Sequence, residues 1–425
     1  MKNPNGIKWT RLDNASKIFP ATFSVKDTKV FRFTCELNEK VEQDILQEAL
    51  NITIEDFPLY KSVLRRGMFW YYFESSDLKP VVQIESYPVC APIYIGQRDN
   101  LLFRVFYYNK RINFEIFHAL SDGTGALWFM QSLVYHYLKL KHKEIFANTI
   151  SPYKNISISR QMDDSFGKHF IGGNIFNLNI KSRKKQHKIR AYHIRGTRAE
   201  ESRTMLIEGS MSVNSILELV NKYNTTVTIF IASLYIYSVY KEMPARTKKH
   251  SVVLSVPINL RQFFESVTAR NFFSTVNVGY NFEKGTHDLK SVIEGISASF
   301  KRDLTVEQLN QQLNQLMSLE RNPFARVIPL QFKDYVLRIV SKSKEREITS
   351  NISNMGQISM PSEFNPFIRQ FSVCTGAGLP KATLCSFDDR MVISFTSPFR
   401  ETDIQRAFFQ ELSKQGIKIQ ISSNF

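Results

Sequence analysis

Hydrophobic and polar positions in the first quarter of the chain predict a strand, a helix and a hairpin. Residues 29–37 alternate between apolar and polar side chains, which is typical of a strand, and residues 41–52 place their apolar side chains on one helical face. Residues 60–65 and 68–74 are rich in aromatic and β-branched side chains and are separated by Arg66 and Gly67, which predicts a β-hairpin.

The pattern changes period near residue 123. Residues 101–108 and 112–117 predict a second hairpin, whose turn contains Asn109, Lys110 and Arg111. After Gly123 the apolar residues recur at helical spacing as far as Leu140. The sequence therefore predicts a strand that passes through a short turn into a helix.

The second half also mixes helices and strands. A helix that begins at Ser212 or Ser215 is expected to reach Tyr223, and a longer one covers residues 225–243. Two helical stretches cover residues 289–319 and 324–340, and the capping-box spacing of Thr305 and Gln308 divides the first. Strands are expected at residues 252–256, where Pro257 ends the strand, and at 275–282, 348–352, 370–374, 382–386 and 391–396, before a last helix at 402–412.

Length and composition indicate two domains of α/β (α+β) class. The 425 residues are 43% hydrophobic, which is more apolar material than one core usually holds. Residues 181–203 contain nine Lys or Arg against two Glu with little apolar periodicity. We therefore expect an N-terminal lobe of residues 1–180, an exposed basic crossover at 181–203, and a C-terminal lobe of residues 204–425.

The net charge by itself does not identify the class of binding partner. A net charge of +17 suits nucleic acid, anionic lipid or the phosphates of a nucleotide-bearing cosubstrate, and equally a plain basic surface. No helix-turn-helix or RNA-binding signature is found, so no nucleic-acid partner is expected. The most apolar stretch, residues 228–240, is too short to span a bilayer, and the four cysteines form no CxxC pair or Cys/His cluster. We expect no transmembrane segment, no metal site and a cytoplasmic location.

Residues 113–129 carry the chemistry. They read NFEIFHALSDGTGALWF, and His118, Asp122 and Gly123 form an HxxxDG pattern between the predicted strand and helix. An imidazole with an ordinary pKa near 6.5 accepts a proton from an attacking hydroxyl at neutral pH and passes it to a leaving thiolate. We assign His118 as general base, Asp122 to holding the loop through a cationic partner, and Gly123 to the sharp entry into the helix. Taken alone, the segment also fits a core histidine, a capping aspartate and a turn glycine.

Several segments together resemble one acyltransferase superfamily. The HxxxDG motif resembles the signature shared by chloramphenicol acetyltransferase, alcohol acetyltransferases, plant BAHD acyltransferases, polyketide-associated acyltransferases and nonribosomal peptide condensation domains. Residues 9–20 (WTRLDNASKIFP) and 67–74 (GMFWYYFE) look like bacterial alcohol acetyltransferase-like members. Residues 255–264 (SVPINLRQFF) and 352–356 (ISNMG) are similar to later segments of the superfamily, in the same order.

The resemblance implies a fold and a set of roles. Members have two chloramphenicol-acetyltransferase-like α/β sandwich lobes with a channel between them, and the histidine lies midway along it. Carried over, His118 is the general base and Asp122 pairs with an arginine from the other lobe, for which Arg261 is the best positional match. Asn271, Ser353 and Asn354 are expected to bind substrate near the developing oxyanion.

The resemblance also implies an activity. Phe117 stands where condensation domains have a first histidine, and no carrier domain is attached, which favours a stand-alone enzyme. We expect an O-acyltransferase that moves an acetyl or other short acyl group from acyl-CoA to a small-molecule alcohol, with no permanently bound cofactor. An amine acceptor, or condensation with an acyl-carrier protein as donor, is the alternative, and a non-catalytic binding protein is a second. Acceptor, acyl length and oligomeric state remain open.

Overall fold

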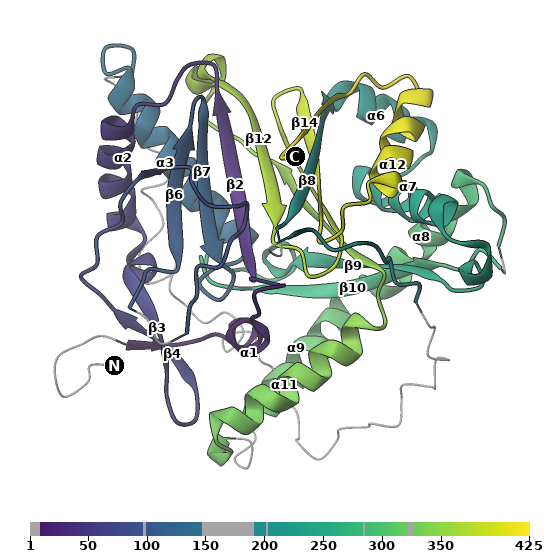
Figure 1. Ribbon diagram of the computed structural model, residues 1–425, viewed down its shortest axis with the longest axis horizontal. Helices are drawn as coiled ribbons and strands as arrows, with labels where there is room; N and C mark the ends of the chain where they lie inside the picture. Colours follow the sequence, from purple (N-terminus) through teal and green to yellow (C-terminus); the bar gives the residue numbers. More distant parts are fainter. Residues whose placement is uncertain (1–8, 97–98, 147–190, 201–202, 284, 322–325) are drawn as a thin grey trace.

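The computed structural model describes residues 9–96, 99–146, 191–200, 203–283, 285–321 and 326–425. Two large β-sheets lie between two layers of helices (Figure 1). The sheets meet where β12 and β13 pack together, and Cys385 Sγ in β13 lies 3.4 Å from the Phe371 carbonyl oxygen in β12. This is the two-lobed α/β architecture that the sequence predicts.

The first lobe is built on a five-stranded sheet. In spatial order it contains β12 (Ile368–Thr375), β2 (Val30–Leu37), β7 (Arg111–Phe117), β6 (Phe103–Tyr108) and β5 (Gln83–Ile84). All neighbours are antiparallel except β5 and β6. The helices α2 (Gln43–Asp56) and α3 (Gly123–Lys141) cover its outer face (Figure 1). Asn109 turns the hairpin between β6 and β7 with a φ of 51°, a conformation that asparagine tolerates better than most residues.

The second lobe is built on a seven-stranded sheet. Its order is β10 (Phe273–Tyr280), β9 (Val252–Asn259), β11 (Ser350–Gln357), β13 (Lys381–Phe387), β14 (Arg390–Ser397), β8 (Met205–Ser212) and β15 (Gln420–Ser423). On its outer face lie α6 (Val213–Lys222), α7 (Val227–Glu242), α8 (Leu289–Asp303) and α12 (Asp403–Lys414). Ser212, and not Ser215, caps α6 through its hydroxyl. Strands β8 and β15 are additions to the elements that the sequence predicts.

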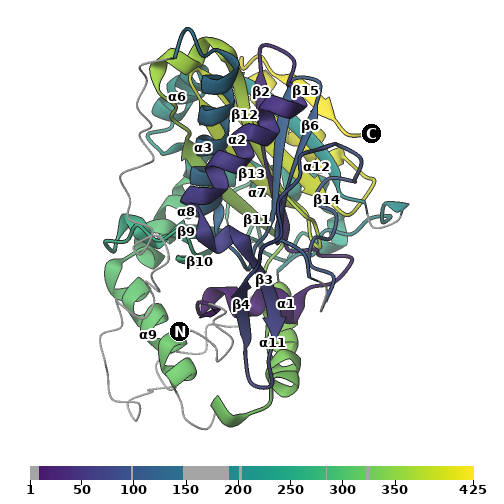
Figure 2. The same cartoon turned by 90° about the vertical axis from the view of Figure 1, so that its left-hand side faces the viewer.

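A smaller third layer lies below the two sheets. It contains a sheet of β1 (Trp9–Arg11), β4 (Tyr71–Ser75) and β3 (Ser62–Arg66), and the helices α1 (Ile18–Thr22), α9 (Val306–Arg321) and α11 (Leu330–Glu345) (Figure 2). Single-turn helices occur at Ala15–Lys17, Pro58–Lys61, Ala245–Thr247, Leu260–Gln262 and Ser362–Phe367. Thr305 precedes α9, and its hydroxyl accepts a hydrogen bond from the Gln308 amide, so the predicted division of the long helical stretch is confirmed.

Strand β9 corrects one prediction. Pro257 was expected to end this strand, but the strand continues to Asn259 with Pro257 opposite Thr275 of β10. Strand β11 pairs with β9 only at Leu254 and Ser255. Past that point β9 has β10 alone as a neighbour, and a proline is tolerated where one side of a strand has no partner.

The chain crosses between the lobes more than once. Strand β12 comes late in the sequence but pairs with β2 over its whole length, so a single cut in the chain does not separate the two sheets. Within the predicted crossover, residues 181–190 and 201–202 lie outside the described residues. Of the remainder, Ala191 pairs with Ser251 and Arg198 with Phe399, so this part runs along the second lobe. In the described part of the chain, no helix is long and apolar enough to cross a bilayer.

Candidate active site

The HxxxDG residues lie on the turn that joins β7 to α3. Strand β7 ends at Phe117, and the His118 amide donates to the Lys29 carbonyl oxygen at 2.8 Å. The Leu120 amide then bonds back to the Phe117 carbonyl, which closes the turn. Asp122 is the N-cap of α3, and Gly123 is the first residue of that helix. The turn is therefore fixed to the sheet at one end and to a capped helix at the other.

Asp122 forms a buried ion pair with the second lobe. Its Oδ2 lies 2.8 Å from Arg261 Nη1, and the two side chains are only 5% and 6% exposed. The same oxygen accepts a hydrogen bond from the Phe272 amide at 2.8 Å, while Oδ1 accepts from the Gly125 amide at 3.0 Å. Three hydrogen-bond donors thus hold the carboxylate, and none of the three is the His118 imidazole.

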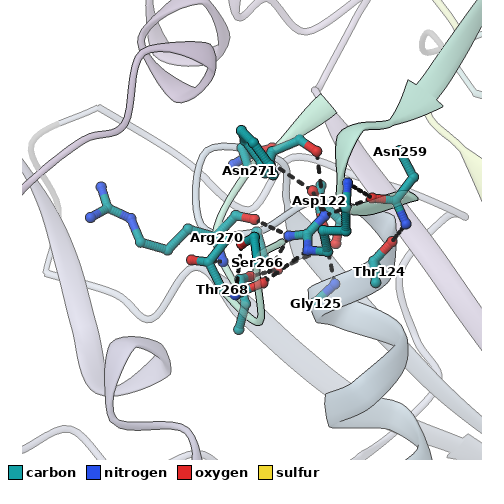
Figure 3. Close-up of polar contacts among 12 residues, drawn as sticks. Asp122, Thr124, Gly125, Asn259, Ser266, Thr268, Arg270 and Asn271 are labelled. Carbon is teal, nitrogen blue, oxygen red and sulfur yellow. Dashed lines mark hydrogen bonds and ion pairs between the residues drawn. The ribbon is translucent and has the colours of Figure 1, made fainter. Parts of the chain in front are cut away.

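Arg261 in turn organises the loop before β10. Its Nη2 donates to the carbonyl oxygens of Thr268 at 2.8 Å and Arg270 at 2.6 Å, and its Nη1 to Asn259 Oδ1 at 3.2 Å. Figure 3 shows Asp122, Thr268 and Arg270 converging on this network. A guanidinium with several donors in one plane suits such a role. The pair therefore joins the turn of the first lobe to the loop at 268–272 of the second.

The hydrogen bonds around Asn271 assign the protonation of His118. Asn271 Nδ2 donates to Ser16 Oγ at 2.8 Å and to the His118 carbonyl at 2.9 Å, which identifies its other terminal atom as the acceptor oxygen. That Oδ1 lies 3.1 Å from His118 Nδ1. In the neutral ring Nδ1 must then carry the hydrogen, because an amide oxygen cannot donate. The lone pair of Nε2 is left to accept a proton.

Aromatic rings surround the imidazole. Phe19 of α1 stacks on it with the centroids 4.1 Å apart, Phe31 meets it edge-on at 4.9 Å, and Phe273 lies 5.7 Å away. Burial lowers the pKa of His118 to about 4, although the nearby Asp122 charge and the Asn271 hydrogen bond raise it. The residue as a whole, backbone included, is partly exposed. Because burial lowers its pKa, the ring is neutral at physiological pH.

The side chain of Asn271 is held by contacts within the protein. It was expected to donate a hydrogen bond to substrate, but its Nδ2 already donates to Ser16 and to the backbone of the turn, and the residue is 1% exposed. Its contact with the site runs through the oxygen that receives His118 Nδ1. In this arrangement Asn271 fixes the orientation of the His118 ring.

Ser353 and Asn354 lie on β11 of the second lobe. Asn354 Nδ2 donates to Thr228 Oγ1 at 2.9 Å, and its Oδ1 accepts from the Gly356 amide at 2.8 Å. Both polar atoms of the Asn354 side chain thus have partners in the second lobe. The next residue, Met355, reaches the HxxxDG turn, because a Cβ placed on Gly123 would lie 2.8 Å from its Sδ and Cε. The structure brings His118, Asp122, Gly123, Arg261 and Asn271 together, and it places the end of β11 beside them.

Sequence reasoning missed Phe19, Ser16 and Gly125. The first two lie far from the motif in sequence, within residues 9–20 that carried part of the resemblance. Gly125 was in view, but its requirement is tertiary: an added Cβ would lie 2.0 Å from the Ala269 carbonyl oxygen. A glycine in the first turn of a predicted helix gives no signal of that close backbone approach.

The arrangement of His118 suits proton transfer. Within the described ranges, no group of three or more His, Cys, Asp or Glu side chains is arranged to hold a metal ion. The site contains a neutral, desolvated imidazole with a fixed Nδ1–H and an Nε2 that can accept a proton. Such a group can act as a general base toward a hydroxyl or amine.

Comparison with known proteins finds similarity in structure. No protein-family model and no curated protein matches this sequence. Among solved structures, the chain is similar to TRI3 trichothecene 15-O-acetyltransferase from Fusarium sporotrichioides, with a TM-score of 0.65, 11% identity and coverage of 96% of this chain and 94% of that one. It is similar to polyketide synthase associated protein 5 from Mycobacterium tuberculosis, with a TM-score of 0.62, 13% identity and coverage of 95% and 96%.

A third similar structure is a condensation domain. It is a mutant starter condensation domain of rhizomide synthetase RzmA in complex with C8-CoA, with a TM-score of 0.61, 12% identity and coverage of 95% and 94%. At such identities the comparison establishes the fold. The chain therefore shares, over nearly its whole length, the two-lobed fold of these acetyltransferase and condensation-domain structures.

Proposed function

We propose that this protein is an acyltransferase that moves an acetyl or other short acyl group from acyl-CoA to the hydroxyl of a small-molecule alcohol, with His118 as general base. Acyl-CoA is a cosubstrate here. The proposal includes a channel that brings both substrates to His118, because proton transfer requires the hydroxyl within hydrogen-bond distance of Nε2.

One observation carries the proposal. The Asn271 oxygen holds the hydrogen of His118 Nδ1 at 3.1 Å, so that Nε2 is the proton acceptor, and burial keeps the ring neutral. The same turn is fixed by Asp122 and Arg261, whose side chains lie 2.8 Å apart. Acyl transfer needs a base whose tautomer and position are both fixed, and these contacts fix both for His118. The fold shared with an O-acetyltransferase supports the reaction class.

One histidine can carry out both proton transfers of the reaction. The acceptor hydroxyl attacks the thioester carbonyl carbon while Nε2 takes its proton, and the carbon–oxygen bond forms. The tetrahedral intermediate then collapses, the carbon–sulfur bond breaks, and the imidazolium returns the proton to the departing sulfur. The products are an ester and free coenzyme A. While the ring is positive, the Asn271 oxygen and the Asp122 charge stabilise it.

The test follows release of the coenzyme A thiol. The purified protein is incubated with acetyl-CoA and with longer acyl-CoA donors, each with a panel of alcohols and amines. Thiol release that depends on both the acceptor and His118 supports the proposal. If no donor and acceptor pair produces release above that of a His118→Ala variant, the proposal fails.

A carrier-protein donor is the alternative, and it follows from the structural likeness to condensation domains of synthetases. It is separated by offering the same acyl group on coenzyme A and on an acyl-carrier protein. A large preference for the carrier-bound donor would replace acyl-CoA as the cosubstrate. If neither donor reacts but small molecules bind at His118, the chain is a non-catalytic binding protein that retains the fold.

A further inference from the structure

Helix α11 (Leu330–Glu345) is amphipathic, but its apolar face points to solvent and an acidic side chain is buried. Its acidic residue Asp334 is 3% exposed, and Leu330 at its start is 5% exposed. Its large apolar side chains instead face outward and recur at spacings of three and four along one stripe. The stripe consists of Phe332 (65% exposed), Tyr335 (65%), Val336 (55%), Ile339 (51%) and Val340 (42%). An exposed apolar stripe of this size marks an interaction site.

Polar contacts fix this orientation of the helix. Asp334 Oδ2 accepts a hydrogen bond from the Tyr71 hydroxyl at 2.8 Å and lies 3.3 Å from Arg66 Nη2. Arg338 Nε donates to the Ala21 carbonyl of α1 at 2.7 Å, and Lys333 Nζ donates to the Phe69 carbonyl at 2.9 Å. Turning the helix to bury its stripe would break all of these contacts. The outward stripe is therefore a built feature.

The apolar surface continues onto the β3–β4 hairpin. The Leu330 amide donates to the Met68 carbonyl at 2.9 Å, which places the hairpin tip against the start of α11. Met68 is 73% exposed and Trp70 is 39% exposed. Figure 2 shows α11 beside β3 and β4, at the end of the molecule away from the two large sheets. Stripe and hairpin tip together form what we call the apolar end.

Charges border the stripe in a fixed arrangement. Residues 330–346 contain five basic and two acidic residues, a net charge of +3. At 3.6 residues per turn, Lys342 lies along one side of the stripe and Lys344 along the other, and both are exposed. The two acids, Asp334 and Glu345, fall on the opposite, inward side of the helix. Aromatic and aliphatic side chains edged by cations are typical of a helix that lies in a lipid interface.

We propose that the apolar end docks on an anionic lipid surface. The stripe would enter the boundary between headgroups and acyl chains, and the bordering cations would meet the lipid phosphates. A second copy of the chain is a poorer occupant, because two such faces would bring like charges together. This inference does not depend on the acyltransferase activity. It concerns a surface that shares none of the site residues named above.

Vesicle co-sedimentation of the full chain tests the docking. We expect binding to phosphatidylcholine vesicles that contain phosphatidylglycerol, little binding to pure phosphatidylcholine vesicles, and weakening by salt. The double variant Phe332→Glu/Ile339→Glu should bind the anionic vesicles more than about tenfold more weakly. It replaces two apolar side chains that would enter the lipid with charged ones. Lys342→Gln/Lys344→Gln should cost roughly fivefold per lysine.

The control is Leu217→Glu on α6, an equally apolar side chain that is 42% exposed on the second lobe. It should bind as the unchanged protein does, and circular dichroism checks that every variant is folded. Absence of vesicle binding at low salt would overturn the proposal, as would equal binding by Phe332→Glu/Ile339→Glu. A dimer in analytical ultracentrifugation that this double variant abolishes would also overturn it, by assigning the face to a second copy.

Discussion

Two polar residues of the turn, His118 and Asp122, lie four positions apart but in opposite surroundings. Asp122 is held by three donors, one of them the Arg261 guanidinium at 2.8 Å. His118 is packed among the rings of Phe19, Phe31 and Phe273 and meets Asn271 at one nitrogen. Dense hydrogen bonding makes the carboxylate a fixed mount. Desolvation keeps the imidazole neutral, as the proposed general base requires. Within this turn, Asp122 fixes the backbone and His118 is the proposed proton acceptor. The two roles can therefore be tested separately.

His118→Ala should have the largest effect, and the effect should fall on activity. Removing a positioned general base usually lowers turnover by ~10²–10⁴. The fold should survive, because the turn keeps its backbone hydrogen bonds to Lys29 and Phe117. Turnover is measured as thiol release from acyl-CoA at saturating substrate, next to a thermal unfolding curve. Turnover comparable to that of the unchanged protein would remove His118 from the mechanism.

Asp122→Asn should act mainly through stability. It leaves the buried Arg261 without its counter-ion, and losing one partner of a buried pair costs about 3–5 kcal/mol in the free energy of unfolding. Activity should fall as well, because the turn that carries His118 loses its mount. Urea unfolding measures the first effect and thiol release the second. An inactive variant of unchanged stability would move Asp122 from the mount to the chemistry.

A pair of glycine substitutions tests how closely the turn that carries His118 packs against the second lobe. In Gly125→Ala the new Cβ would meet the Ala269 carbonyl, a backbone atom that cannot swing aside, and such overpacking costs about 1–3 kcal/mol. In Gly123→Ala the Cβ meets the flexible end of Met355. We expect that variant to lose less stability than Gly125→Ala. Equal unfolding midpoints for the two would contradict the close approach of the lobes at Gly125.

The pH dependence tests the surroundings of the base with the gentlest perturbation. The pKa of His118 is lowered from 6.5 to about 4, so the ring stays unprotonated as the pH falls through 6 and 5. The acidic limb of kcat/KM should therefore lie near pH 4, and activity should change little between pH 5 and 7. A limb at about pH 6.5 would show that the imidazole is more hydrated than its aromatic contacts indicate.

The sequence by itself determined the local elements and the residues of the chemistry. Period-two and helical spacing gave β2, α2, β7 and α3, and the HxxxDG pattern placed a histidine at a strand end because both features depend on neighbours in the chain. Even the partner of Asp122 was matched correctly in position, since Arg261 lies 2.8 Å from it.

Only the tertiary structure decided what depends on distant segments. It decided that β12 joins the first sheet, that Phe19 stacks on His118, that the Asn271 oxygen fixes the tautomer, and that α11 turns its apolar side outward. Apolar spacing shows that a helix has two faces, but it does not show which one the rest of the chain covers. A pKa likewise depends on which groups folding brings close. Those contacts join residues far apart in the sequence, and spacing within a short window carries no information about them.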